Sequence, residues 1–410
     1  MGLSVFHLTT EPPYPAVSGG RVRSAASLSV LDGVPEVTRV TVQHLREDAD
    51  DANARERFLG TLARTDILPP IVHPIHVRQH LSLVPRILAL RGLGVPYLAG
   101  KWSSSALVKR LREVVPALRP DVLYIDHLGM MHYAHLLRQL APRARMVLEQ
   151  HNVESDFFAQ RAERASGVQR QLISIEAERA RTYEATALRE VDAVIAISPI
   201  DAAAFADMAG VRAHVVPQIV PIDEVRTDTP SGPLLYVGNL GWHPNVAGLD
   251  WFFAEVWPRL RARDPELRLR IAGSGLAKDA QGKPLAPSAW QQPGVEILGF
   301  VPDLGPLYRS SSLVVAPIHG GSGVRIKLLE AMRAGLPLVT TTEAVDGTLA
   351  RPGEHLEAHT EPAAFADAVL GLATDPARRV QLRDAAYDFL RAQHSRAAAT
   401  AQMRAALGIE

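Results

Sequence analysis

One stretch of the sequence, residues 310–335, constrains the fold more than any other. It opens with SSSLVVA, a short apolar and β-branched run that is typical of a strand buried on both faces. A glycine-rich loop follows, and from Ile326 apolar residues recur at helical spacing as far as Gly335, where a helix is expected to end. A buried strand that leads through a glycine loop into a helix is the repeating unit of a parallel sheet. The stretch therefore predicts an α/β fold.

The loop in this stretch is suited to binding an anion. Its three glycines are Gly320, Gly321 and Gly323. They allow backbone N–H groups to come close to a ligand, because no Cβ stands in the way. Arg325 and Lys327 place two positive charges at the expected start of the helix, which costs about 0.3–1 kcal/mol each unless an anion offsets them. Phosphate is the commonest such anion, so the loop predicts a nucleotide-diphosphate site.

The alternative for this loop is a tight turn with solvated basic side chains, and a short glycine motif cannot decide between the two. The longer run GSGVRIKLLEAMRAGLPLVTTTEAVDG (residues 321–347) is more specific. It resembles the donor-site segment of retaining family-4 glycosyltransferases with the GT-B fold, in the subgroup that carries Gly-Ser-Gly-Thr-Arg-Leu-Lys. The small-residue positions, LEAM and the strand GLPLV all agree. The resemblance is specific over residues 234–347 and weaker over residues 1–160.

The resemblance implies a GT-B architecture, in which two Rossmann-like, doubly wound α/β domains face each other across a cleft. We expect an N-terminal acceptor-binding domain over residues 1–222 and a C-terminal donor-binding domain over residues 234–389. A last helix, at about residues 390–410, would pack back on the first domain. The residues alone favour the same division, because strands and helices alternate on both sides of the polar, breaker-rich segment 222–233.

Two positions depart from the family pattern near the diphosphate. Many members carry an arginine after the first strand of the donor domain and a lysine six positions later. This chain has Asn239 and Asn245 there. We expect Arg325 and Lys327 to supply the missing positive charge, and so to be catalytic.

The resemblance also implies the remainder of the donor site. The second of the two family glutamates falls on Glu330, which we expect to hold the ribose hydroxyls, whereas Ser322 replaces the first. Gly273 follows another predicted strand, and the backbone around Phe300 and Val301 is expected to pair with the nucleobase. Backbone contacts would hide the identity of the base from the sequence, and the resemblance favours UDP. The donor sugar cannot be read from Ser322.

A second glycine loop ends at Gly19 and Gly20, after the first strand of the chain. The segment lacks the G-x-G-x-x-G dinucleotide fingerprint. The resemblance places a loop that faces the donor phosphates at this point. A plain turn between strand and helix is the alternative.

Polar side chains follow two predicted strands of the first domain. Asp126 and His127 follow one, and His151, Asn152 and Glu154 follow the next, within an HNVE run that resembles the subgroup. Ligands of open α/β sheets bind outside the carboxyl ends of the strands. We therefore expect the two histidines in catalysis and the other three residues in acceptor binding. The alternative makes each histidine a hydrogen-bonded core residue.

Metal-ligand patterns are weak in this chain. The pair Asp48 and Asp50 resembles the motif of metal-dependent glycosyltransferases of another fold, but it lies in a polar loop crowded with like charges. His73, His76 and His80 do not share one face of a strand. There is no cysteine. We expect neither a metal nor any other cofactor.

Composition narrows the partners. Formal net charge is zero, which argues against a nucleic-acid binder. No apolar run approaches the ~20 residues that cross a bilayer, and the N-terminus is too polar for a signal peptide. We therefore expect a cytoplasmic protein, from a bacterium to judge by its frequent Arg and Ala. Residues 82–118 form either a basic amphipathic surface that contacts lipid headgroups or an ordinary pair of core helices.

The function implied by the resemblance is metal-independent transfer of a sugar from a nucleotide-diphosphate sugar to an acceptor hydroxyl, with retention of anomeric configuration. The sequence does not choose the acceptor among a lipid-linked saccharide, a polysaccharide end and a small natural product. Two rivals remain: a nucleotide-sugar 2-epimerase of the same fold, and a non-catalytic glycosyltransferase-like protein.

Overall fold

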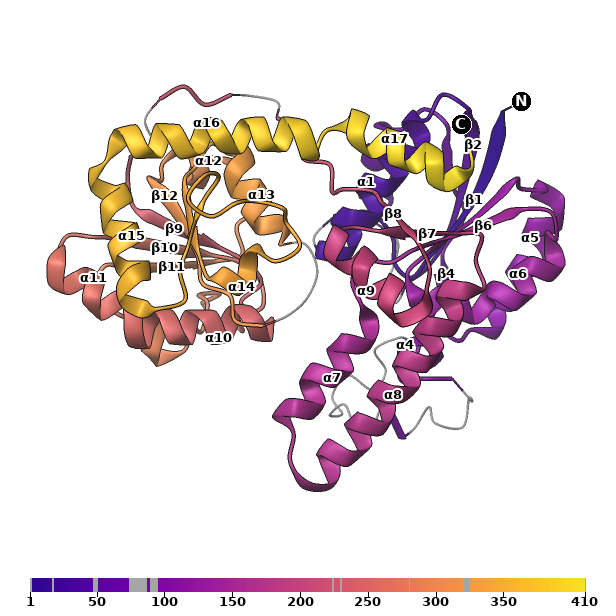
Figure 1. Cartoon of the computed structure of the whole chain (residues 1–410), viewed down its shortest axis with the longest axis horizontal. Helices are drawn as coiled ribbons and strands as arrows, with labels where there is room; N and C mark the ends of the chain where they lie inside the picture. The colour runs from indigo at the N-terminus through magenta and orange to yellow at the C-terminus, as the bar shows by residue number, and fades with distance from the viewer. Residues whose placement is uncertain are drawn as a thin grey trace. The chain divides into compact units, whose positions relative to one another are not determined.

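The computed structural model describes residues 2–16, 18–46, 51–73, 87–88, 95–222, 225–228, 231–279, 281–320 and 325–409. Contacts divide the chain into two units (Figure 1). Unit 1 comprises Met1–Gln218 and Arg396–Glu410, and unit 2 comprises Ile219–Ser395. Each unit is built on a parallel sheet, as the alternation of strands and helices predicted. The predicted Asp48, Asp50, His76, His80, Gly321, Ser322 and Gly323 lie outside the described residues.

Unit 1 is a doubly wound sheet of the order β3-β2-β1-β5-β6-β7-β8, with β4 paired to β2. Its strands are β1 (Leu3–Thr9), β2 (Val37–Arg46), β3 (Thr65–Ile67), β4 (Ile71–Val72), β5 (Val122–Asp126), β6 (Arg145–Glu149), β7 (Ala193–Ala196) and β8 (Ala213–Val215). Its helices are α1 (Gly19–Gly33), α2 (Ala52–Leu59), α4 (Tyr97–Gly100), α5 (Ser105–Leu118), η2 (Leu128–Tyr133), α6 (Ala134–Leu140), α7 (Glu154–Arg164), α8 (Gly167–Arg189), α9 (Pro199–Ala209) and α17 (Arg396–Leu407). Helices α7 and α8 pack on each other as a hairpin that projects away from the sheet (Figure 1).

Unit 2 has the strand order β11-β10-β9-β12-β13-β14. Its strands are β9 (Leu234–Val237), β10 (Leu269–Ala272), β11 (Val295–Gly299), β12 (Leu313–Ala316), β13 (Leu338–Thr340) and β14 (Glu357–Ala358). Its helices are α10 (His243–Trp251), η3 (Phe252–Val256), α11 (Trp257–Arg263), η4 (Ser288–Trp290), α12 (Gly305–Arg309), α13 (Ile326–Arg333), α14 (Thr342–Val345), α15 (Pro362–Thr374) and α16 (Pro376–Gln393).

The apolar strands of unit 2 are buried on both faces, which is why they read as continuous hydrophobic runs. Alternate residues of a strand point to opposite faces. In β9, Leu234 and Tyr236 belong to one core cluster and Leu235 to another, and all three are fully buried. Strand β12 divides its side chains in the same way. Helices cover both faces, as in other parallel sheets.

Each sheet has one point at which the strand order reverses. In unit 1 this switch point lies between β1 and β5, and in unit 2 it lies between β9 and β12. Loops diverge there, and open α/β sheets bind ligands in the crevice that results. Of the predicted site residues, Asp126 and His127 stand at the end of β5, and Asn239 and Gly320 follow β9 and β12.

The expected long helices are broken in two places. Where a last helix was expected at about residues 390–410, α16 continues to Gln393 and a separate helix, α17, starts at Arg396. Helix α17 packs on α1 of unit 1, where Arg396 donates to the carbonyl of Ser29 over 2.7 Å. Within the predicted helical region 82–118, α5 begins only at Ser105, because the Ser104 hydroxyl caps it by accepting from the N–H of Leu107. Residues 74–86 and 89–94 lie outside the described residues.

Candidate functional site

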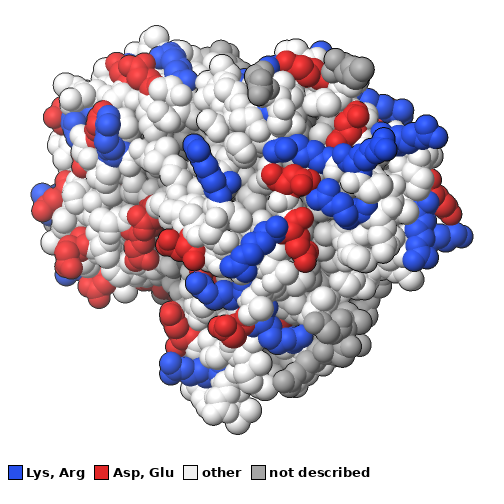
Figure 2. All heavy atoms as spheres, turned by 45° about the vertical axis from the view of Figure 1, so that its right-hand side comes forward, with Lys and Arg blue, Asp and Glu red and all other residues white. Residues whose placement is uncertain are grey.

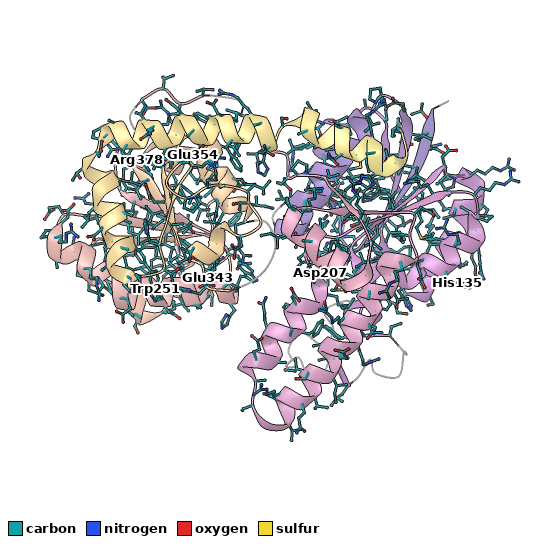
Figure 3. The ribbon with its side chains drawn as sticks, in the orientation of Figure 1. His135, Asp207, Trp251, Glu343, Glu354 and Arg378 are labelled. Atoms are coloured by element: carbon teal, nitrogen blue, oxygen red, sulfur yellow. The ribbon has the colours of Figure 1, made fainter. Side chains whose placement is uncertain are left out.

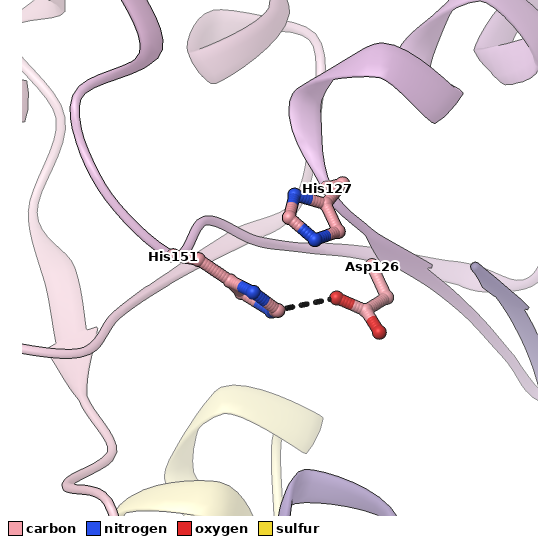
Figure 4. Close-up of side chains that lie close together, drawn as sticks. All are labelled: Asp126, His127 and His151. Atoms are coloured by element: carbon pink, nitrogen blue, oxygen red, sulfur yellow. Dashed lines mark ion pairs between the residues drawn. The ribbon is translucent and has the colours of Figure 1, made fainter. Parts of the chain in front are cut away.

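A buried ion pair stands at the carboxyl edge of the sheet of unit 1. Asp126 is the last residue of β5, and its Oδ1 atom lies 2.8 Å from Nε2 of His151, which follows β6 (Figure 4). Asp126 is fully buried and His151 is nearly so. His7 of β1 approaches from the other side, with Nε2 3.7 Å from Oδ2 of Asp126. The carboxylate therefore lies between two imidazoles at the switch point.

The charges in this cluster depend on one another. Burial opposes ionisation of Asp126, but the His151 imidazole outweighs burial and holds the Asp126 pKa well below its usual value. Burial lowers the pKa of His7. Among the described residues, the ring nitrogens of His7 lack a hydrogen-bond partner, whereas Asp126 and His151 are joined by their 2.8 Å contact. A buried imidazole without a hydrogen-bond partner is uncommon in proteins.

His127 lies between this cluster and solvent. Its ring centroid is 3.9 Å from that of His151, and its Nδ1 atom is 3.8 Å from Oε1 of Glu154, the first residue of α7. Burial alone would lower the pKa of His127, but the Glu154 and Asp126 carboxylates raise it. The backbone of His127 has φ 83°, a value that non-glycine residues rarely adopt. This conformation directs the chain from β5 towards η2.

A second buried carboxylate, that of Glu149, lies near the cluster of Asp126, His151 and His7. Glu149, at the end of β6, accepts hydrogen bonds over 2.7 Å from Arg23, Ser27 and Tyr124. The Tyr124 ring stacks on His7 with centroids 5.0 Å apart. Sequence reasoning missed His7 and Glu149. Glu149 could have been predicted because it stands at the end of a strand, as Asp126 does. No local sequence pattern indicates that Arg23 is its partner.

A polar pocket of about 220 Å³ opens beside His127 within unit 1. Its lining residues are Thr10, Glu11, Ser18, Gly20, Arg21, Ser24, Leu98, Lys101, Trp102, His127, Gly129 and Glu154. Of the predicted residues, Gly20, His127 and Glu154 line the pocket. Asp126 and His151 do not line it, but the His151 ring centroid lies 3.9 Å from that of His127. Gly19 begins α1, and the half-buried Asn152 follows His151. Neither of these two lines the pocket.

In unit 2 a lysine bridges the switch point. The Nζ atom of Lys327, in α13, donates a hydrogen bond to Oδ1 of Asn245 in α10. Nδ2 of Asn245 donates in turn to the carbonyl of Asn239 over 2.8 Å. The structure thus brings the two asparagines together with the lysine that was expected to supply their missing charge.

Lys327 is held in surroundings that weaken its charge. Burial, with the positive charge of Arg325, lowers the pKa of Lys327 to about 7. Its Nζ atom lies 5.4 Å from the centre of the Tyr236 ring. Gly238 leaves room beside it, because a Cβ there would lie 2.9 Å from Nζ. A bound anion would favour the charged form of this lysine.

Arg325 is the N-cap residue of α13 rather than a residue of its first turn. It is 6% exposed, its Nη2 atom donates to the carbonyl of Gly320 over 3.1 Å, and its guanidinium lies 5.7 Å from the centre of the Trp242 ring. Gly320 has φ 75°, a conformation that suits glycine.

The other predicted donor residues lie at the same edge of the sheet, because they follow neighbouring strands. Gly273 follows β10, and its N–H donates to the carbonyl of Gly299 over 2.7 Å. Phe300 comes next and is 58% exposed, and Val301 is half-buried. Glu330 lies further along α13, where burial raises its pKa and Arg333 opposes that shift.

Sequence reasoning missed Glu343 and His319. Glu343 stands at the start of α14, directly beyond β13. Its Oε1 atom lies 2.9 Å from Nδ1 of His319, and its Oε2 atom accepts from the N–H of Gly320 over 2.8 Å. No local pattern would have indicated this pairing, since 23 residues separate Glu343 from Gly320.

Family models match both halves of the chain. Residues 62–224 match the model described as Glycosyltransferase Family 4, and residues 232–375 match the model described as Glycosyl transferases group 1. The chain carries the two glycosyltransferase domains of the GT-B fold. The Arg325 and Lys327 cluster falls within the second match, and Asp126, His127 and His151 fall within the first.

Solved structures share this GT-B fold over nearly the whole chain. Anabaena Alr3699/HepE in complex with UDP and glucose is 15% identical, with a TM-score of 0.63 and 99% of each chain covered. A mutant of S. aureus TarM in complex with fondaparinux, alpha-GlcNAc-glycerol and UDP is 10% identical, with a TM-score of 0.70 and 99% of each chain covered. At these identities the likeness shows the fold alone.

One curated relative matches more closely in sequence over part of the chain. It is an uncharacterized 44.6 kDa protein in the cps region of Klebsiella pneumoniae, 25% identical over 177 residues. The match covers 43% of this chain and 46% of the relative.

Three further features concern membrane-spanning helices, possible metal ligands and the distribution of surface charge. Among the described residues, no helix is long and apolar enough to cross a membrane. Asp126, His127 and His151 offer ligand atoms that all lie within 4.8 Å of one another, a spacing that could hold a metal ion. The absence of a metal from the reaction remains a prediction. Over the face shown in Figure 2, basic and acidic side chains are interspersed.

Proposed function

We propose that the protein moves a sugar from a UDP-sugar to an acceptor hydroxyl, with retention of anomeric configuration and without a metal ion. One observation carries the proposal: Arg325 and Lys327 stand together at the switch point of unit 2, inside the region that matches glycosyltransferases. HepE and TarM were solved with UDP, which supports UDP as the nucleotide here.

The chemistry of the donor side follows from charge. When the bond between the anomeric carbon and the diphosphate breaks, negative charge develops on the leaving oxygen. Fixed cations stabilise that charge, which is the role a divalent ion plays in other enzymes. Arg325 is held by its bond to Gly320 and Lys327 by its bond to Asn245, so neither needs to reorganise during the reaction.

The pocket of unit 1 suits a saccharide acceptor. It is lined mostly by polar and charged groups, and Trp102 offers an apolar edge on which a sugar ring can pack. HepE was solved with glucose and TarM with alpha-GlcNAc-glycerol. As the acceptor oxygen bonds to the anomeric carbon, its proton passes to the departing phosphate. His127 then orients the sugar, while Asp126 and His151 fix the charge and the position of the His127 ring.

A donor and acceptor screen tests the proposal. UDP-, GDP- and TDP-sugars are screened by thermal shift, and each donor that stabilises the protein is incubated with candidate acceptors in the presence of a chelator. We expect a UDP-sugar to raise the melting temperature and to be consumed only when a saccharide acceptor is present.

Three results would contradict it. Activity that vanished with the chelator and returned with magnesium would contradict metal independence. Formation of an epimer from the UDP-sugar alone would identify a 2-epimerase. Tight binding of UDP without turnover on any acceptor would indicate a non-catalytic protein.

A further inference from the structure

We propose that Glu343 is a positioning residue for the donor diphosphate, which it serves by fixing Gly320 and, through Gly320, the guanidinium of Arg325. The inference rests on the proposed function, because it assumes that Arg325 binds the diphosphate. Neither the family resemblance nor the sequence pattern assigns a role to Glu343.

The Glu343 carboxylate holds two consecutive residues. Its Oε2 atom accepts from the N–H of Gly320 over 2.8 Å, and its Oε1 atom lies 2.9 Å from Nδ1 of His319. Trp251 packs edge-on against His319, with ring centroids 5.0 Å apart. Figure 3 labels Glu343 and Trp251 near each other in unit 2. Both oxygens of the carboxylate are thus engaged by the segment that follows β12.

Gly320 is held from both sides of its backbone. Its N–H donates to Glu343, and its carbonyl accepts from Nη2 of Arg325 over 3.1 Å. Glu343 therefore fixes the peptide that leads into Gly320, and the carbonyl on the other side of the same Cα is a bonding partner of the guanidinium. A shift of the carboxylate would be passed to Arg325 through a single residue.

The neighbouring backbone is tied to two other elements. The Thr341 hydroxyl donates to the carbonyl of Ile318 over 2.5 Å and accepts from the N–H of Ile318 over 3.3 Å. The N–H of His319 donates to the carbonyl of Pro244, in α10, over 3.3 Å. This support leaves little freedom to the segment before Gly320, so the arrangement is organised before a ligand arrives.

The charge of Glu343 points to an indirect role. Burial would raise its pKa, but the bonds from His319 and Gly320 and the positive charge of Arg325 lower it, so the side chain is an anion. An anion would repel a diphosphate at short range. Glu343 therefore does not contact the ligand itself. Its role is to hold the N–H of Gly320 and, through Gly320, the guanidinium of Arg325.

Binding of UDP to the full-length protein tests the inference. In Glu343→Gln the amide can accept a hydrogen bond only through its single oxygen, so it can no longer hold both Gly320 and His319 as the carboxylate does. Loss of the negative charge by itself would favour UDP, so a fall in affinity reports the lost positioning. We expect UDP affinity, measured by titration calorimetry, to fall by about tenfold, which is the effect of losing one hydrogen bond to a charged group. The donor KM should rise by a similar factor, while the acceptor KM and the melting temperature stay close to those of the wild type.

Two further variants serve as controls. Glu354→Gln removes a half-exposed carboxylate of unit 2 that pairs with Arg351, and it should leave UDP affinity unchanged. Glu343→Asp keeps the charge and should recover part of the affinity. Should Glu343→Gln fail to fold, Glu343→Asp carries the test alone, with an intermediate loss of affinity expected.

The outcomes separate the two proposals. Wild-type protein that bound no UDP would overturn the proposed function, and this inference with it. Wild-type protein that bound UDP, with Glu343→Gln binding it equally well, would overturn this inference alone. A loss of melting temperature with unchanged UDP affinity in the folded fraction would also overturn it, since Glu343 would then support only the fold.

Discussion

The side-chain amine of Lys327 donates a hydrogen bond to the side chain of Asn245 across the point where the strand order of unit 2 reverses. The family resemblance of the sequence places a lysine at the position of Asn245. The positive charge of Lys327 therefore lies beside the side chain that stands in place of that family lysine. We infer that the charge of the diphosphate site has moved from the helix after β9 to the helix after β12.

Removing either cation should impair turnover more than folding. We expect Arg325→Ala and Lys327→Ala each to weaken transition-state stabilisation by about 2–4 kcal/mol, as the loss of a charge-stabilising donor commonly does. The value of kcat/KM for the donor measures the effect. Arg309→Ala, at the end of α12, is a matched control in the same unit. Near wild-type turnover in both site variants would refute the reassigned charge.

The pKa of Lys327 predicts a pH dependence of donor binding. Its ordinary value of 10.5 is lowered to about 7, so in the free protein the ammonium is present below pH 7 and is lost as the pH rises. UDP is fully ionised above about pH 7.5, since phosphate monoesters lose their second proton near pH 6. UDP affinity should therefore fall between about pH 7.5 and pH 9.

Lys327→Arg provides the control, because arginine stays charged over that range. Its UDP affinity should change little with pH. The folded protein also binds fewer protons at Lys327 than the unfolded chain does between about pH 7 and 10.5, so this residue makes the free energy of unfolding rise with pH in that window. Lys327→Met should lose that component. Equal pH profiles for wild type and Lys327→Arg would be inconsistent with a titrating lysine.

Glu330 should act on the donor side. Its position on α13 follows that of Lys327 by three residues, and we expect its carboxylate to hold the ribose hydroxyls. Glu330→Gln should raise the donor KM more than the acceptor KM in steady-state kinetics. The opposite order would assign Glu330 to the acceptor.

The histidines of unit 1 should affect activity and stability differently. His127 is half-buried and lines the pocket, so His127→Ala should lose turnover and keep its melting temperature. His151 is nearly buried against the Asp126 carboxylate, and His151→Ala should lose both, because it leaves that charge without its partner. His135→Ala, on the exposed end of α6, is a control (Figure 3). If His127→Ala lost stability and activity together, a structural role would explain it better.

Much of the fold could be predicted from the sequence because parallel strands carry a local signal. Short apolar runs such as residues 313–316 and 122–125 are buried on both faces, and the glycine loops and helix starts follow them directly. The start of the last helix was predicted only roughly, at about residue 390, whereas α16 extends to Gln393 and α17 starts at Arg396.

The site could be predicted only where its residues follow a strand. Asp126, His127 and His151 stand at strand ends, and the structure brings them together. His7 and Glu343 were missed because their partners are distant in sequence. His7 meets Asp126 through the pairing of β1 with β5, and Glu343 meets Gly320 from α14, which follows the neighbouring strand β13.

The most direct test of the account is a single reaction followed by nuclear magnetic resonance. The protein is incubated with the UDP-sugar that stabilises it most, a saccharide acceptor and a chelator, and the anomeric configuration of the product is read from its coupling constants. The account predicts release of UDP and a new glycosidic bond with the configuration of the donor, and neither product with the Arg325→Ala, Lys327→Ala double variant. An inverted product, or transfer only after magnesium is restored, would contradict it.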